Sequence, residues 1–208
     1  MTDKINNSES REKLIECAKR EFLEKGFAKA SLRKITGDAG LTTGAVYFFF
    51  GDKNGLFDGV VGSALQKLMN VIETHFTQDT EEDFLAYKQQ YGDHDEFAKQ
   101  LVDVIYDNLD EMTILLKGSA GSKYEHFIDA LIDRMDKVYI KMAERFAAVM
   151  PGKRVNKKML HWLCHVQINA FLHMIEHEPD KESALGFICP VMDMLVKAWI
   201  DFALEDDK

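Results

Sequence analysis

Apolar residues recur every three or four positions along most of the chain, and no stretch alternates apolar and polar residues as a half-exposed strand does. The pattern therefore predicts helices and an all-α fold. The clearest helix keeps one apolar face over about five turns. We expect about nine helices, with residues 77–96 as a loop or an imperfect helix. The third helix starts at a cap on Thr42 or Thr43 and includes residues 45–48, and the others are expected at 10–26, 31–39, 53–75, 96–117, 127–150, 156–177 and 180–204.

Small polar residues and glycines mark the ends of the first helices. Ser10, Ser31 and Asp52 can each cap a helix N-terminus, because a short side-chain oxygen accepts a hydrogen bond from a free backbone N–H. Gly26 and Gly40 can end the first and second helices. The N-terminal part should therefore hold three helices in front of a longer fourth one.

The fourth helix contains three glycines, Gly55, Gly59 and Gly62. Each costs roughly 0.5–1 kcal/mol relative to alanine inside a helix. They either allow close packing or form a compliant link between two parts of the chain. We favour close packing.

Two short helices joined by a glycine turn predict a helix-turn-helix, which places its second helix in the major groove of DNA. Thr42 and Thr43 begin that helix with small hydrogen-bonding side chains, and one of them can cap it. Tyr47 can offer its hydroxyl to phosphate, and Lys53 lies at a helix N-terminus, where phosphate binding is favoured. The candidate DNA-contacting residues are Ser31, Arg33, Lys34, Thr42, Thr43, Gly44, Tyr47 and Lys53.

The same spacing also fits an ordinary helical subdomain, in which the aromatic run at residues 47–50 is core. The alternative function is then a helical small-molecule-binding or enzyme domain with no role on DNA.

Residues 11–61 resemble the N-terminal domain of the TetR (tetracycline-repressor-like) family. The family pattern around the recognition helix is G-x-[ST]-x-G-x-[LV]-Y-x-[HY]-F-x-x-K-x-x-L. Eight residues of this chain match it in register: Gly40, Thr42, Gly44, Val46, Tyr47, Phe50, Lys53 and Leu56. Phe49 departs from the pattern, and its side chain has no donor for a phosphate.

The resemblance implies a transcriptional regulator, and we expect a repressor that is not an enzyme. Residues 1–55 would form the DNA-binding domain, and residues 56–208 a helical domain for ligand binding and dimerisation. The homodimer would form through the last two helices and bind a palindromic double-stranded DNA operator. A small-molecule effector would release the DNA.

Methionine and aromatic residues gather in the C-terminal part and suit an adaptable apolar cavity, so we expect a largely apolar effector. Ordinary core packing is the alternative for any one of them. The candidate ligand-binding residues are Met112, Leu116, Met135, Tyr139, Met142, Trp162 and Phe171.

The net charge of −9 argues against nucleic-acid binding, but the acidity is uneven. The first 60 residues carry ten Lys and Arg against nine Asp and Glu. The candidate DNA-binding segment is thus less acidic than the rest of the chain, although its charge alone is a weak argument for DNA binding.

Four histidines, His161, His165, His173 and His177, follow one helix at intervals that are multiples of four. The last two lie in an HxxEH pattern, but the row sweeps a broad helical face, which disfavours a peptidase zinc site. The row could line a pocket or a dimer seam. A metal or pH response through His161 and His165, beside Cys164, is a weaker hypothesis.

No metal site or cofactor is expected from the remaining patterns. The three cysteines form no CxxC pair, and the chain shows no phosphate loop and no GxSxG elbow. The polar N-terminus lacks an apolar signal segment, and no run of 18 or more apolar residues occurs. We expect a cytoplasmic protein without a membrane span.

Overall fold

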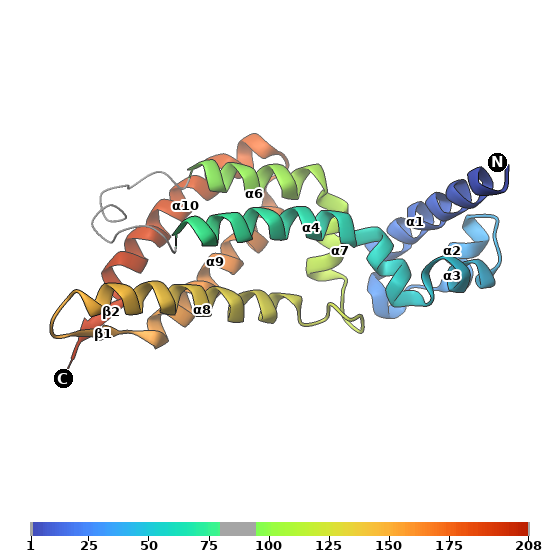
Figure 1. Cartoon of the computed structure of the whole chain (residues 1–208). Helices are drawn as coiled ribbons and strands as arrows, with labels where there is room; N and C mark the ends of the chain where they lie inside the picture. Colours follow the sequence, from blue (N-terminus) through green and yellow to red (C-terminus); the bar gives the residue numbers. More distant parts are fainter. Residues whose placement is uncertain (1, 80–94, 208) are drawn as a thin grey trace. The chain divides into compact units, whose positions relative to one another are not determined.

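The computed structural model describes residues 2–79 and 95–207, and these residues form nine helices and a two-stranded ribbon (Figure 1). The all-α prediction is confirmed. The elements are α1 (Thr2–Lys29), α2 (Leu32–Asp38), α3 (Thr43–Phe50), α4 (Lys53–Asp79), α6 (Asp95–Asp107), α7 (Leu109–Lys117), α8 (Phe127–Ala148), β1 (Lys153–Val155), α9 (Lys157–His177), α10 (Lys181–Phe202) and β2 (Leu204–Asp206). The prediction for residues 77–96 falls mostly on residues 80–94, which lie outside the described residues.

The chain divides into two compact units, and each is built from two separate stretches of sequence. The first unit holds the described residues within Met1–Lys67 and Asn108–Phe127. The second holds those within Leu68–Asp107 and Ile128–Lys208. The expected boundary between residues 55 and 56 does not coincide with this division, and its assignment of DNA binding and ligand binding to the two sides stays a prediction.

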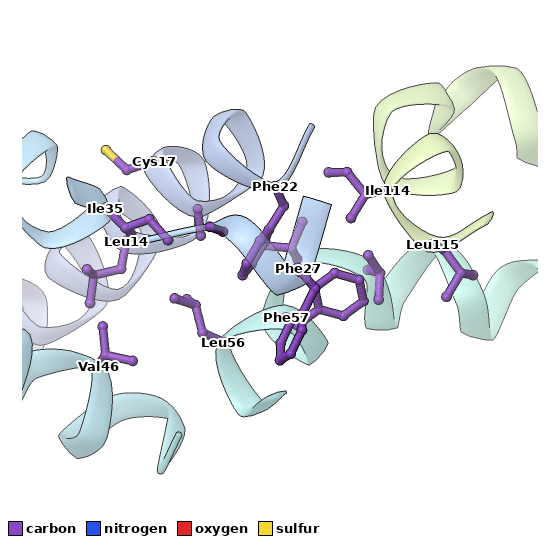
Figure 2. Close-up of a cluster of buried hydrophobic side chains, with 14 residues drawn as sticks. Leu14, Cys17, Phe22, Phe27, Ile35, Val46, Leu56, Phe57, Ile114 and Leu115 are labelled. Atoms are coloured by element: carbon purple, nitrogen blue, oxygen red, sulfur yellow. The ribbon is translucent and has the colours of Figure 1, made fainter. Parts of the chain in front are cut away.

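Aromatic side chains from α1 and α4 form the centre of the first unit. Figure 2 shows Phe22 and Phe27 meeting Phe57, whose ring centroid lies 5.1 Å from that of Phe22 and 5.3 Å from that of Phe27. Ile114 and Leu115 bring α7 to the same cluster. Each such side chain stabilises the fold by roughly 1.5–3 kcal/mol when it is fully buried. The segment that carries α7 is therefore part of this core.

The second unit is a bundle of long helices in which α10 packs against both α9 and α6. The Trp199 ring contacts Tyr139 and Phe146 edge-on, with centroids 6.2 Å and 5.6 Å apart. The Tyr106 hydroxyl donates to the carbonyl oxygen of Glu178 at 2.9 Å, where the chain turns from α9 to α10. This aromatic and hydrogen-bonded packing joins α6, α8, α9 and α10.

Helix α1 begins at Thr2, well before the cap expected at Ser10. No proline or glycine interrupts this polar stretch, and pairs such as Lys13 with Glu9, at 2.7 Å, support its exposed face. Gly26 breaks the helical backbone as expected, with φ 69° and ψ 168°. A last helical turn follows and ends at Lys29.

The single helix expected over residues 96–117 is wrong, because the structure has α6 and α7 there. Asn108 separates them with φ −135° and ψ 39°. Its Oδ1 accepts from Lys67 Nζ at 3.3 Å. Asparagine readily leaves the helical conformation, because its side chain competes for hydrogen bonds. The break coincides with the point where the chain passes from the second unit to the first.

The ribbon of β1 and β2 was not predicted. It pairs Lys153 with Asp206, Arg154 with Glu205 and Val155 with Leu204 in antiparallel register. Three-residue strands carry too little alternation to be recognised in sequence. Helix α10 consequently ends at Phe202, two residues before the expected end.

The preference for close packing at the glycines of α4 is confirmed at two of the three positions. A Cβ at Gly55 would lie 1.9 Å from the carbonyl oxygen of Phe50, and one at Gly59 would lie 2.9 Å from Cε1 of the Phe50 ring. A Cβ at Gly62 would meet nothing within 4 Å. Gly55 and Gly59 therefore let α4 approach the end of α3.

Helix α10 is, within the described residues, the one helix long and apolar enough to cross a membrane, with a mean hydropathy of 1.5 in its most apolar window. One third of that window is buried. A single helix of this kind is a weak indication, since helices at the core of a bundle have the same length and composition.

Candidate nucleic-acid interface

The start of α2 is fixed by Ser31 and by a carboxylate from α1. Ser31 Oγ accepts the backbone N–H of Lys34 at 3.3 Å, so the expected cap is confirmed. Glu21 Oε1 accepts the backbone N–H of Ser31 at 3.1 Å, and Glu21 is almost fully buried. The sequence did not single out Glu21, although its place on the inner face of α1 was the available signal.

The turn between α2 and α3 requires a glycine. Gly40 has φ 68°, in the left-handed region that side chains disfavour. The next N–H, from Leu41, donates to the carbonyl of Thr36 at 2.8 Å and closes the end of α2. The buried Ile35 fixes α2 on the core. This is the tight connection that a helix-turn-helix needs.

Helix α3 presents one polar and aromatic face to solvent. The carbonyl of Thr42 accepts from the N–H of Ala45 at 2.9 Å, while the Thr42 hydroxyl makes no capping bond. Thr43, Gly44 and Tyr47 are exposed, and the Tyr47 side chain is 57% exposed. These four residues all belong to the predicted contact set, and the structure brings them to the start and the outer face of one short helix.

Phe48 is the residue that the sequence analysis missed. Its side chain is 73% exposed, whereas Val46 is fully buried. On a helix, residues 43, 44, 47 and 48 share one side, so the period of the helix was the signal that could have found it. The aromatic run hid that signal, because Phe49 and Phe50 are partly buried against the core.

Lys53 contacts the protein rather than pointing freely into solvent. Its Nζ donates to the carbonyl oxygen of Ala30 at 2.7 Å and lies 4.7 Å from the centre of the Phe27 ring. Burial lowers the pKa of Lys53 from its ordinary value. The ammonium therefore links the start of α4 to the α1–α2 connection, and its other two donors stay available to a phosphate.

The two basic residues that begin α2 differ in their surroundings. Lys34 Nζ lies 2.7 Å from Asp38 and 3.8 Å from Glu21. Arg33 is exposed, and no ion pair joins it to another of the described residues. Arg33 is consequently the more available of the two to a phosphate.

A segment far along the chain holds the N-terminal part of α4. The backbone N–H of Lys123 donates to Asn54 Oδ1 at 2.9 Å, and the Lys123 ammonium and the Tyr124 hydroxyl both contact the Asp58 carboxylate. Burial is the main cause that raises the pKa of Tyr124, with Asp58 adding to it, so the phenol stays protonated. The stretch 118–127 thus fixes the N-terminal part of α4, the helix that follows the recognition helix α3.

The seven candidate ligand-binding residues do not gather at one place. Met112 and Leu116 belong to the first unit. Trp162 is 58% exposed on α9. Of the remaining four, Met135 and Met142 are buried on α8, while Tyr139 and Phe171 are partly buried. Their role in ligand binding stays a prediction.

A part-buried polar pair includes one of these residues, Tyr139. The Tyr139 hydroxyl and Gln167 Oε1 are 2.8 Å apart, between α8 and α9. Burial raises the pKa of the neighbouring Cys164 thiol, and the Asp136 carboxylate raises it further. Cys164 therefore stays protonated, which disfavours a redox-sensing thiolate.

Comparisons with known proteins agree with this geometry. Residues 14–60 match the family model described as bacterial regulatory proteins, tetR family. The HTH-type transcriptional repressor BepR of Brucella suis is 39% identical over 61 residues, which is 29% of this chain and 29% of BepR. The HTH-type transcriptional regulator YerO of Bacillus subtilis is 24% identical over 207 residues, which is 95% of this chain and 68% of YerO.

A solved structure extends the likeness in fold to most of the chain. The TetR family transcriptional regulator PfmR from Thermus thermophilus matches with a TM-score of 0.57 and 18% identity, over 88% of this chain and 96% of that one. Residues 14–60, which match the family model, lie within the first unit, which contains the glycine turn and the exposed face of α3. Residues 14–60 therefore belong to the tetR family of bacterial regulatory proteins, whose members are helix-turn-helix transcriptional regulators and not enzymes.

Proposed function

We propose that this regulator is a ligand-responsive repressor that binds a palindromic operator as a homodimer. Residues 1–55 contact DNA, and residues 56–208 bind the effector and dimerise. The observation that carries the proposal is the solvent-exposed face of α3, where Thr43, Gly44, Tyr47 and Phe48 stand opposite the buried Val46.

Each exposed side chain on α3 suits a different part of DNA. The Thr43 hydroxyl can donate to or accept from a base edge, and Gly44 lets the backbone approach closely. The Phe48 ring suits the methyl group of thymine, which is the apolar feature of the major groove. Tyr47 and Arg33 reach phosphates, which fix the register of the protein without reading sequence.

The dimer is proposed to form through α9 and α10. Large apolar side chains are exposed on both helices: Trp162 on α9, and Met194 and Phe202 on α10. A second copy would cover them, and a two-fold axis would present two recognition helices to two half-sites. The same face accounts for the apolar character of α10 without a membrane.

The effector is proposed to be a small, largely apolar molecule bound in the second unit. It releases DNA because it binds more tightly to a dimer whose recognition helices no longer match the half-site spacing. The change in operator affinity cannot exceed the ratio of the effector's affinities for the two states. The protein acts where the operator is, so we propose a cytoplasmic location.

A binding-site selection from random duplexes tests the DNA-binding part of the proposal. The protein is unfolded and refolded first, so that no effector carried over from expression occupies it. We expect an inverted repeat, with half-site centres about 10 base pairs or a multiple of that apart. Affinity should fall steeply with salt. Equal binding to all duplexes would overturn the proposal.

A further inference from the structure

His161 and His165 lie one turn apart on α9, and one ring nitrogen of each lies close to that of the other. The two Nε2 atoms are 3.2 Å apart, and the rings are nearly perpendicular, at 81°. Two imidazole nitrogens bound to one ion at about 2.1 Å would subtend an angle of about 100° at this separation. That angle lies between those of octahedral and tetrahedral sites.

A carboxylate from the neighbouring helix sets the tautomer of His161. Its Nδ1 lies 2.5 Å from Oδ2 of Asp136 on α8. A carboxylate only accepts, so Nδ1 carries the proton of the neutral ring, and Nε2 is left with a free lone pair 3.2 Å from Nε2 of His165. This is the carboxylate–imidazole arrangement that orients histidine ligands in metal sites.

Asp136 is itself held in place. Its second oxygen accepts from the thiol of Cys164 at 3.3 Å. Cys164 directly precedes His165 in the sequence, and its side chain is fully buried. In the single chain both imidazoles are exposed, so an ion can reach them from solvent. Asp136 on α8 therefore fixes the orientation of His161, and the two imidazole rings face solvent in the single chain.

We propose that His161 and His165 bind a first-row transition-metal dication through their Nε2 atoms, with Asp136 positioning His161 and water completing the coordination. In the absence of the ion, a proton of His165 occupies the space between the two nitrogens. Within the described ranges, no group of three or more His, Cys, Asp and Glu side chains is placed to hold a metal. The site therefore has two protein ligands, and it binds more weakly than a four-ligand structural zinc site. The proposal does not depend on the DNA-binding function.

Calorimetric titration of the tag-free, metal-stripped full chain with zinc tests the proposal. We expect one ion per chain with saturation below about 1 mM zinc. Nickel should bind more tightly than cobalt, and magnesium should not bind, because imidazole favours the later transition metals. His161→Gln and His165→Gln should each abolish zinc binding.

The matched control is the double variant His173→Gln/His177→Gln. These histidines share the spacing and the helix of the proposed pair, but Nε2 of His177 faces Glu176 at 4.0 Å. The control should bind zinc as the unaltered chain does. Asp136→Asn should weaken binding about 10- to 100-fold. Its positioning role is read from the nitrogen chemical shifts of His161, which report the tautomer and should change in this variant.

Three outcomes would overturn the proposal. One is the absence of saturable binding up to about 1 mM zinc. Another is the loss of binding in the control variant rather than in His165→Gln. The third is a stoichiometry of one ion per two chains, which would replace water by ligands from a second copy. Thermal unfolding of every variant shows that each chain is folded, and the exposed positions of the substituted histidines favour this.

Discussion

A methyl group at Gly55 should disturb the recognition helix more than one at any other glycine of α4. The added Cβ would lie 1.9 Å from the backbone carbonyl oxygen of Phe50, whereas ordinary contacts begin at 3.4 Å. The obstacle is backbone, so a side-chain rotation cannot relieve it. The turn between α3 and α4 would have to move by about 1.5 Å.

The size of the effect follows from two opposing contributions. Overpacking of this kind costs about 1–3 kcal/mol of the free energy of unfolding. Replacing glycine by alanine raises the free energy of unfolding by about 0.5–1 kcal/mol, because glycine is the poorer helix former. We expect Gly55→Ala to lose about 1–2 kcal/mol, which lowers Tm by about 2–4 °C for each kcal/mol in a chain of this length.

Two other glycines of the same helix provide the controls. Gly62→Ala meets open space and should gain up to about 1 kcal/mol. Gly59→Ala should fall between the two, because its obstacle is the edge of the Phe50 ring at 2.9 Å, which can shift. Urea unfolding followed by circular dichroism measures all three. If Gly55→Ala were as stable as Gly62→Ala, the geometric reasoning would be refuted.

Three further substitutions test the interface. Phe48→Ala should weaken the preference for thymine at one position of each half-site by about 1–3 kcal/mol in a binding-site selection, and an equal loss on every sequence would contradict a thymine contact. Lys53→Met should cost about 1 kcal/mol in urea unfolding, because the Ala30 carbonyl loses its donor. It should also lower the salt slope of operator binding by about one, and an unchanged slope would remove Lys53 from the phosphate contacts. Ser31→Ala should cost about 0.5–2 kcal/mol of unfolding free energy while Ser31→Asp retains the cap, so equal losses in both variants would argue against capping.

Local chemistry explains why most helix ends near the interface could be predicted. The caps at Ser31 and Asp52 and the turn at Gly40 depend on residues within three or four positions of each other. The sequence contains all of that information. The match to the family pattern covers this same region, and the start of the recognition helix was predicted to within one residue, with Thr42 and Thr43 as alternative caps.

Features that depend on distant parts of the chain could not be predicted in the same way. The break at Asn108 accompanies the return of the chain to the first unit, and the ribbon pairs residues about fifty positions apart. The exposure of Phe48 depends on which side of α3 the core occupies. Hydrophobicity alone gives the opposite answer for this residue.

The interrupted first unit limits how this regulator can be divided or recombined. A fragment that ends at residue 67 would contain the recognition helix but not Ile114, Leu115 and Tyr124. Phe57 would lose its contact with the Tyr124 ring, and Asp58 would lose its contacts with the Lys123 and Tyr124 side chains. A chimera that exchanges DNA specificity between relatives should therefore transplant residues 108–127 together with the N-terminal segment. Residues 108–127 lie in sequence between two segments of the second unit, but they pack within the first unit. Mutations selected for a changed effector response must therefore preserve this stretch.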